Sequence, residues 1–262
     1  MARSNALEAE DLEQLEQNSG SASAIRETPP GADWNPIEEA FLRRRSVRKY
    51  KTRQVPAHLI RRMLEIGRFA PSQGNSQAWK FVVVRDKKLI ERMEQYCVDE
   101  FKKMSPALDY TLYPQGSLRR WFTRLKARLL NRLDHNMLHP VPMTVLTSIA
   151  EGRFAVFHKA PTVILLLVDR RGVGCPEIDI GIVGTNIVMA AQSLGLGTCW
   201  IGFSKFLNKN KEMAAQFGAE WPYEISEAIT VGYPIGDPAQ NHISRQTHEI
   251  AWWEDGQKEV FY

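Results

Sequence analysis

The chain has 262 residues, of which 44% are hydrophobic and 24% charged, so it is long enough to form one sizeable globular core. Its 34 Lys and Arg residues are nearly balanced by 30 Asp and Glu residues, far from the basic excess of a dedicated nucleic-acid-binding protein. The three cysteines form no C-x-x-C pair, so the usual ligand spacing of zinc and iron–sulfur sites is missing and we expect no metal centre.

Residues 1–33 differ in composition from the rest of the chain. They are rich in Glu, Ser, Ala and Gln and close with Pro29-Pro30-Gly31, a mixture that buries little apolar surface. We expect a flexible N-terminal extension here, followed by one domain over 34–262. The acidic start lacks the basic and apolar regions of a signal peptide, and no apolar run approaches the roughly 18 residues that span a bilayer. These features predict a cytoplasmic protein.

The domain is expected to combine helices with strands. Asn35-Pro36-Ile37-Glu38 places a capping Asn, a first-turn Pro and a Glu at the third helical position, which predicts a helix to about Arg43. An apolar stripe predicts a second helix over 56–69, which Pro71 stops. The other expected elements are strands over 80–84, 162–168, 198–201 and 225–231, and a nearly all-apolar helix over 179–194 that Gly195 ends. Together they predict an α+β fold with helices flanking a mixed sheet.

A basic insertion is expected at about 104–152. One helical face there carries the apolar residues Trp121, Phe122, Leu125, Leu129 and Leu133. Arginines surround this face at positions 119, 120, 124, 128 and 132, so the segment is an amphipathic basic helix. The favoured interpretation is a lid or packed insertion with a solvated basic face. The alternative is a surface that binds a membrane or another anionic partner.

The first run with chemical potential is Arg43-Arg44-Arg45-Ser46-Val47-Arg48, which leaves the first helix. Several guanidinium groups and a hydroxyl within six residues can surround a phosphate, because the planar fork of Arg matches two phosphate oxygens. Taken alone, the run is more typical of a solvated helix end that complements the helix dipole than of a phosphate site.

The second run, Ala70 to Trp79, is a loop of small residues and amides directly before an expected strand. Such a loop brings backbone and carboxamide groups close to a planar heterocycle, whose edges Asn75 and Gln77 would recognise. In isolation, it is equally consistent with a helix-to-strand turn whose amides satisfy local backbone groups.

The two runs in this order, about 25 residues apart, resemble the nitroreductase family. The resemblance covers roughly residues 35–250 apart from the basic insertion. It rests on five ordered blocks: Arg44 to Arg48, Ala70 to Trp79, His158-Lys159-Ala160-Pro161, Gly195-Leu196-Gly197-Thr198 with Trp200-Ile201-Gly202, and Val231-Gly232-Tyr233-Pro234.

The resemblance implies a nitroreductase-like fold with a mostly antiparallel sheet, in an intertwined homodimer that binds two FMN molecules at its interface. Arg44, Ser46 and Arg48 would hold the phosphate and ribityl chain, with Arg45 also among the cofactor-binding residues. Arg245 would join them from the C-terminal segment. The family often carries a K-x-R pair there, and Ile243 stands at the Lys position of this chain, which weakens that part of the match.

For the ring, the resemblance implies Pro71, Ser72, Asn75 and Gln77 on one side, contributed across the dimer interface. Trp200, Ile201 and Gly202 would approach the ring edge, with a backbone N–H near the flavin N5.

The implied activity is an FMN-dependent, NADH- or NADPH-consuming oxidoreductase. Hydride would pass by a ping-pong mechanism to a small, planar, electron-poor acceptor such as a nitroaromatic or quinone. No catalytic side chain is assigned, because the chemistry resides on the flavin, and none of the six histidines is assigned a role. We also expect Arg48 to stabilise the reduced ring if it reaches that far. The alternatives are flavin binding or sequestration without turnover, and the use of flavin for dehalogenation or ring fragmentation.

Overall fold

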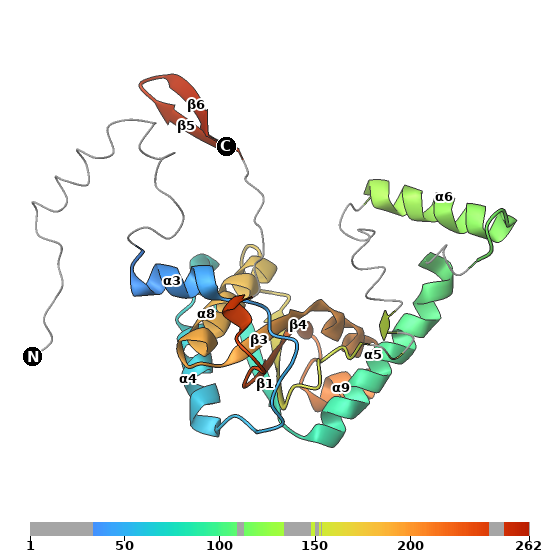
Figure 1. Cartoon of the computed structure of the whole chain (residues 1–262), viewed down its shortest axis with the longest axis horizontal. Coiled ribbons are helices and arrows are strands. Elements are labelled where there is room, and N and C mark those ends of the chain that lie inside the picture. The colour runs from blue at the N-terminus through green and yellow to red at the C-terminus, as the bar shows by residue number, and fades with distance from the viewer. Residues whose placement is uncertain are drawn as a thin grey trace, which may run out of the picture. The chain divides into compact units, whose positions relative to one another are not determined.

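The computed structural model of the chain describes residues 34–108, 113–133, 148–149, 152, 154–240 and 249–261 (Figure 1). The chain divides into two compact units. The smaller unit comprises Met1–Arg43 and His242–Tyr262, and the larger unit comprises Arg44–Asn241. The predicted N-terminal extension and Arg245 lie outside the described residues, so the expectations about them stay predictions.

In the smaller unit, helix α3 (Pro36–Arg43) begins as predicted. The Asn35 side-chain oxygen accepts hydrogen bonds from the backbone N–H groups of Ile37 (2.9 Å) and Glu38 (3.1 Å). The Glu38 carboxylate accepts one from the Asn35 backbone N–H at 2.7 Å, so the two residues form a reciprocal capping box.

The smaller unit also contains an antiparallel hairpin of β5 (Ile250–Glu254) and β6 (Gln257–Phe261). The hairpin turns at Asp255 and Gly256, which have φ angles of 49° and 75°. Two consecutive residues with positive φ are typical of a tight hairpin turn, for which Asp-Gly is a preferred sequence. The hairpin is absent from the predicted elements although this turn signal is present in the sequence.

The larger unit is built on a four-stranded antiparallel sheet with the order β1-β2-β4-β3. Its strands are β1 (Trp79–Val84), β2 (Thr162–Asp169), β3 (Gly197–Ile201) and β4 (Tyr223–Gly232). They match the four predicted strands; β1, β2 and β3 are each one residue longer than predicted, and β4 is three residues longer. Every residue of β2 is buried, because this central strand is covered on both faces.

Helices α4 (Ala57–Arg68) and α8 (Pro176–Ser193) pack on one face of the sheet (Figure 1). Alternate residues of β2 serve this face, and Ile164 and Leu166 pack with Met63 of α4 and Ile187 of α8. Helix α8 begins three residues before its predicted start, with Pro176 in its first turn, and it ends before Gly195, which has a φ of 70°.

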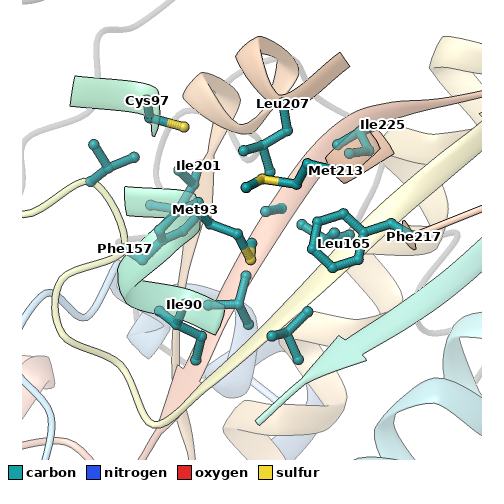
Figure 2. Packing of buried hydrophobic residues seen from close by; sticks show 14 of the residues in the cluster. Ile90, Met93, Cys97, Phe157, Leu165, Ile201, Leu207, Met213, Phe217 and Ile225 are labelled. Carbon is teal, nitrogen blue, oxygen red and sulfur yellow. The ribbon is translucent and has the colours of Figure 1, made fainter. Parts of the chain in front are cut away.

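The other face of the sheet is covered by α5 (Lys87–Leu108), the 3₁₀ helix η3 (Gly202–Lys209) and α9 (Lys211–Gln216). Figure 2 shows this core, in which Met93 of α5, Leu207 of η3 and Met213 of α9 surround Leu165 of β2. Helix α5 was not predicted. Its contact residues follow a regular helical spacing at positions 90, 93, 97 and 101, so the pattern was present in the sequence.

The predicted basic helix is present as α6 (Leu118–Leu133), and the Ser117 hydroxyl caps it by accepting a bond from the Arg120 backbone N–H at 3.2 Å. The expectation of a packed apolar face is not met in its described part, because Trp121 and Phe122 are 57% and 60% exposed. The side chains of Leu129 and Leu133 lie outside the described residues. None of the helices in the described ranges is long and apolar enough to cross a membrane.

An extended segment, 46–51, runs along the edge of the sheet beyond β3. The Val47 backbone N–H donates to the Thr198 carbonyl at 2.8 Å, and the Lys51 N–H donates to the Tyr233 carbonyl at 2.8 Å. The buried Tyr50 hydroxyl donates to the Val47 carbonyl at 2.6 Å and lies 2.8 Å from the Thr230 hydroxyl. Burial raises the pKa of Tyr50 well above its usual range, so this phenol stays protonated.

Replacing Tyr50 by Phe should therefore lower the free energy of unfolding by about 1–3 kcal/mol, because it leaves buried oxygens at Val47 and Thr230 without this partner. Chemical denaturation of the two proteins measures the difference. Tyr96→Phe is the matched control, since the Tyr96 hydroxyl has no hydrogen bond to another described residue, and it should change stability much less. Equal stability of Tyr50→Phe and the parent chain would contradict the assigned role.

Candidate functional site

The arginine-rich segment is held against the start of β3. Ser46 forms a parallel bridge with Thr198, and the neighbouring Gly197 allows the close approach of Val47. A Cβ atom on Gly197 would lie only 2.7 Å from a Val47 methyl carbon, so a larger residue there would push the segment away. Residues 46 and 47 of the run are therefore fixed against the edge of the sheet, whereas Arg43 is the exposed last residue of α3.

One buried side chain, Cys199 of β3, has a pKa that three residues of the segment affect: Arg44, Ser46 and Arg48. Burial raises the pKa of the Cys199 thiol, whereas the Arg48 cation, a hydrogen bond with Ser46 and the Arg44 cation act in the opposite direction. Three of the four predicted cofactor-binding side chains of this segment therefore lie within electrostatic or hydrogen-bonding range of Cys199 in β3. This group is called the β3 cationic cluster below.

Arg45 is oriented differently from these three. Its guanidinium donates to the Arg44 carbonyl at 2.9 Å, and it is not among the groups that affect the pKa of Cys199 or His158. Its contribution to ligand binding stays a prediction, as does that of Arg245.

His158 is part of the same region and was not assigned from the sequence. Burial lowers the pKa of His158 to about 4, with a further lowering from the Arg48 cation, so the imidazole is neutral at pH 7. His158 and Lys159 both have positive φ angles, 53° and 52°, in the loop that precedes β2. In the sequence, only the block His158 to Pro161 pointed to this loop, and it gave no indication that the Arg48 cation affects His158.

A half-buried carboxylate positions the His158 loop. Glu94 of α5 accepts hydrogen bonds from the backbone N–H groups of Val156 and Phe157, the latter at 2.9 Å. Burial raises the pKa of Glu94, while these two backbone bonds and the Lys159 cation lower it. Helix α5 therefore helps to place the loop that carries His158, whose pKa the Arg48 cation lowers.

The amide-rich loop has an irregular backbone, with positive φ angles of 60° at Gly74, 52° at Asn75 and 46° at Gln77. The Ser72 hydroxyl accepts a bond from the Gln77 backbone N–H at 3.0 Å, and the Gln77 carboxamide donates to the Asn75 side-chain oxygen at 3.1 Å. Pro71, Asn75 and Gln77 are nevertheless exposed. The loop therefore forms the predicted local turn and also leaves amide side chains exposed, and its role in ligand binding stays a prediction.

The two predicted runs do not meet within one chain. The amide loop precedes β1 at one edge of the sheet, where Trp79 pairs with Val168 near the end of β2. The arginine segment borders β3 at the other edge, where the opposite end of β2 pairs with Val231, the partner of Thr198. The eight residues of β2 span roughly 26 Å, so the runs occupy diagonally opposite corners. One small ligand cannot contact both corners of the same chain.

The third predicted group ends β3. The Trp200 ring packs against Gly184 of α8, where any Cβ atom would clash with it, and Ile201 is buried in the core on the α5 side. Their side chains are structural, which leaves backbone groups and the exposed Gly202 to face a ligand. Gly202 is the first residue of η3, and the first N–H groups of a helix have no partner within it.

An ion pair lies beside Gly202. Lys205 and Glu227 are 2.9 Å apart, and the Glu227 carboxylate lies 3.3 Å from where a Gly202 Cβ would be. Thr198 and Gly202 are four residues apart along β3, which corresponds to about 13 Å. The edge therefore offers cations at one end and backbone N–H groups with a charged pair at the other, which suits an elongated ligand.

The low pKa of His158 makes stability depend on pH. In the folded protein the pKa of His158 is about 4, below the ordinary value of 6.5. The free energy of unfolding is therefore at its full value above pH 6.5 and falls as the pH is lowered through 4, because the unfolded chain takes up the proton more readily. We expect His158→Gln to flatten the fall of Tm between pH 6.5 and 4, whereas His58→Gln, at an exposed position of α4, should not. An NMR titration that gives His158 a pKa of 6.5 or higher would contradict this.

Comparison with known proteins gives relatives over most of the chain. A protein of Methanothermobacter thermautotrophicus whose assigned name joins NADH dehydrogenase and NAD(P)H nitroreductase is 24% identical over 210 residues, covering 79% of this chain and 82% of that protein. The FMN-bound nitroreductase of Bacteroides fragilis aligns with a TM-score of 0.56 at 19% identity, covering 82% of this chain and 95% of that one. Iodotyrosine deiodinase bound to FMN and 3-iodo-L-tyrosine has the same TM-score and identity, with coverages of 82% and 97%.

These solved structures show that the fold is shared and confirm the predicted nitroreductase-like α+β architecture. The family model described as Nitroreductase family matches residues 42–233, a range that contains the arginine segment, the amide loop and all four strands of the main sheet. The chain belongs to the nitroreductase family.

Proposed function

We propose that the protein is an FMN-dependent oxidoreductase that transfers hydride from NADH or NADPH to a small, planar, electron-poor acceptor. The observation that carries the proposal is the β3 cationic cluster. Two guanidinium groups and a hydroxyl gathered at one fixed position suit a dianionic phosphate, and they do so in a chain of a family with FMN-bound members.

The phosphate of FMN would be held by Arg44, Ser46 and Arg48. His158 would present a neutral imidazole to the same region, so it would add a hydrogen-bonding group without repelling the arginines. The ring would extend toward the end of β3, where the first backbone N–H groups of η3 would lie at its edge near Gly202. Pro71, Ser72, Asn75 and Gln77 would line the ring from the partner subunit.

The need for a partner subunit follows from the separation of the two runs. Because the amide loop and the β3 cationic cluster lie at opposite corners of one chain, a site that uses both must take them from two chains. A symmetric homodimer provides two such composite sites. Three exposed apolar residues are consistent with a contact between subunits: Ile66 in α4, Phe69 at its C-terminal end and Ile178 in α8.

When bound, FMN accepts a hydride at N5 and gives it up again, which is the chemistry that the protein itself does not supply. The chain would hold the cofactor, exclude water and offer one ring face to donor and acceptor in turn, which gives a ping-pong order. Arg48 would also stabilise negative charge on the ring if its side chain reaches the pyrimidine edge. No described side chain needs to exchange a proton for this cycle. We also propose that the protein is located in the cytoplasm.

The first test combines cofactor content with turnover. The purified protein should be yellow, release FMN on heating, and oxidise NADH or NADPH in the presence of a nitroaromatic or a quinone, with parallel lines in double-reciprocal plots. Bound FMN without any turnover would instead support flavin sequestration, and turnover with 3-iodotyrosine alone would support dehalogenation. Absence of flavin binding after reconstitution with FMN would overturn the proposal.

Arg48→Ala should weaken FMN binding about 10- to 150-fold, because a hydrogen bond to a charged group contributes about 1.5–3 kcal/mol. Lys49→Ala is the matched control, since it removes the same charge from the adjacent exposed residue, which does not affect Cys199 or His158. Fluorescence titration of the apoproteins measures both affinities. Equal weakening by the two substitutions would show that only net charge matters.

Subunit complementation tests the composite site. Arg48→Ala and Asn75→Ala/Gln77→Ala should each impair both sites of their own homodimer. A mixed dimer of the two would contain one site with all of these residues intact and one site lacking them all. We expect about half of the parent activity in the mixed dimer, isolated with two different affinity tags. Activity no higher than that of the impaired homodimers would mean that both runs act within one chain. A homodimer that keeps the parent activity would mean that the substituted run is not used.

A further inference from the structure

Helix α6 carries an exposed apolar stripe, defined here as Leu118, Trp121, Phe122 and Leu125. These residues are spaced as i, i+3, i+4 and i+7, so they line one side of the helix. They are 76%, 57%, 60% and 49% exposed, respectively. The rings of Trp121 and Phe122 contact each other edge to face with centroids 4.9 Å apart, which joins them into one surface.

The charge around the stripe has a single sign. Residues 110–133 contain no Asp or Glu, and they contain six basic residues: Arg119, Arg120, Arg124, Lys126, Arg128 and Arg132. Arg119, Arg124 and Lys126 are exposed next to the stripe. This concentration contrasts with the nearly balanced charge of the whole chain, 34 basic against 30 acidic residues.

We propose that α6 binds the surface of a membrane containing anionic lipids. The stripe would enter the boundary between headgroups and acyl chains, and the flanking arginines and lysine would contact lipid phosphates. Trp is the residue type that favours this boundary, and the long stems of Arg and Lys can pack on apolar surface while their charges stay in water. With only 16 residues, α6 would lie in the plane of the membrane surface and would not cross it.

Charge complementarity favours this occupant over a second copy of α6. Two such helices packed stripe to stripe would bring their arginines together without any acidic residue of 110–133 to compensate. An anionic lipid surface offers both an apolar interior and many negative headgroups, so it satisfies the two features of the helix at once. This inference is independent of the flavin site.

The test uses the full chain and sedimentation with vesicles. Vesicles of phosphatidylcholine with about one third phosphatidylglycerol should bind the protein, and vesicles of phosphatidylcholine alone should not. Raising the salt concentration should weaken binding without abolishing it, since screening affects the charges and leaves the apolar contact. Trp121→Ser/Phe122→Ser should weaken binding about tenfold or more, and Arg119→Gln/Arg124→Gln/Lys126→Gln about 50-fold or more.

Matched controls separate the helix from general surface properties. Trp221→Ser removes an aromatic side chain that is 79% exposed outside α6, and Arg61→Gln/Arg62→Gln removes two exposed charges of α4. Both controls should bind anionic vesicles like the parent chain, and all variants should keep the parent's circular dichroism and flavin content. The proposal would be overturned if the parent chain did not bind anionic vesicles, or if the α6 variants bound them as well as the parent chain does. It would also be overturned if the parent chain did not bind vesicles and altering the stripe changed only the oligomeric state.

Discussion

The pairing of the extended segment 46–51 with the start of β3 is the constraint on which the rest of the site depends. It converts an arginine-rich run, which in solution would repel itself and stay hydrated, into a fixed edge. The small Gly197 permits the approach, and the buried hydroxyl of Tyr50 holds the turn through the Val47 carbonyl. The cations are thereby positioned before any ligand arrives, which reduces the entropy lost on binding.

The same fold separates the two halves of the proposed site. In a sheet with the order β1-β2-β4-β3, the amide loop and the arginine segment belong to opposite edges and opposite ends. In the proposed site, assembly of two chains would therefore be part of cofactor binding, and the amide loop would contact only the cofactor held by the partner subunit. The apolar stripe of α6 is a second exposed surface, for which we propose an anionic membrane as the partner.

Much of the fold was readable from the sequence, because its signals are local. The capping box at Asn35 and Glu38 identified a helix start, and the apolar run 163–168 identified a strand. The Asp255-Gly256 turn and the helical spacing in α5 were equally local and were missed. The grouping of Arg44, Ser46 and Arg48 was also predicted, from the family resemblance.

The remaining features depend on contacts between distant parts of the chain. Nothing near His158 in the sequence indicates that it faces Arg48, because Glu94 of α5 sets that loop. The core positions of Trp200 and Ile201 likewise depend on α8 and α5. A motif match therefore could not show that their side chains pack in the core and that only their backbone groups are available to a ligand. The exposed apolar stripe of α6 could not be distinguished from a packed face until its surroundings were known.

In the proposed site, the phosphate of the cofactor is bound at the start of β3. The most direct measurement compares the affinities of the parent apoprotein for FMN and for riboflavin, which has the same ring and lacks the phosphate. If the arginine segment binds the phosphate, riboflavin should bind at least about 100-fold more weakly than FMN, because two or more charge-assisted hydrogen bonds are lost. Equal affinities for the two flavins would mean that the arginine segment holds no phosphate, and the proposed site would be wrong.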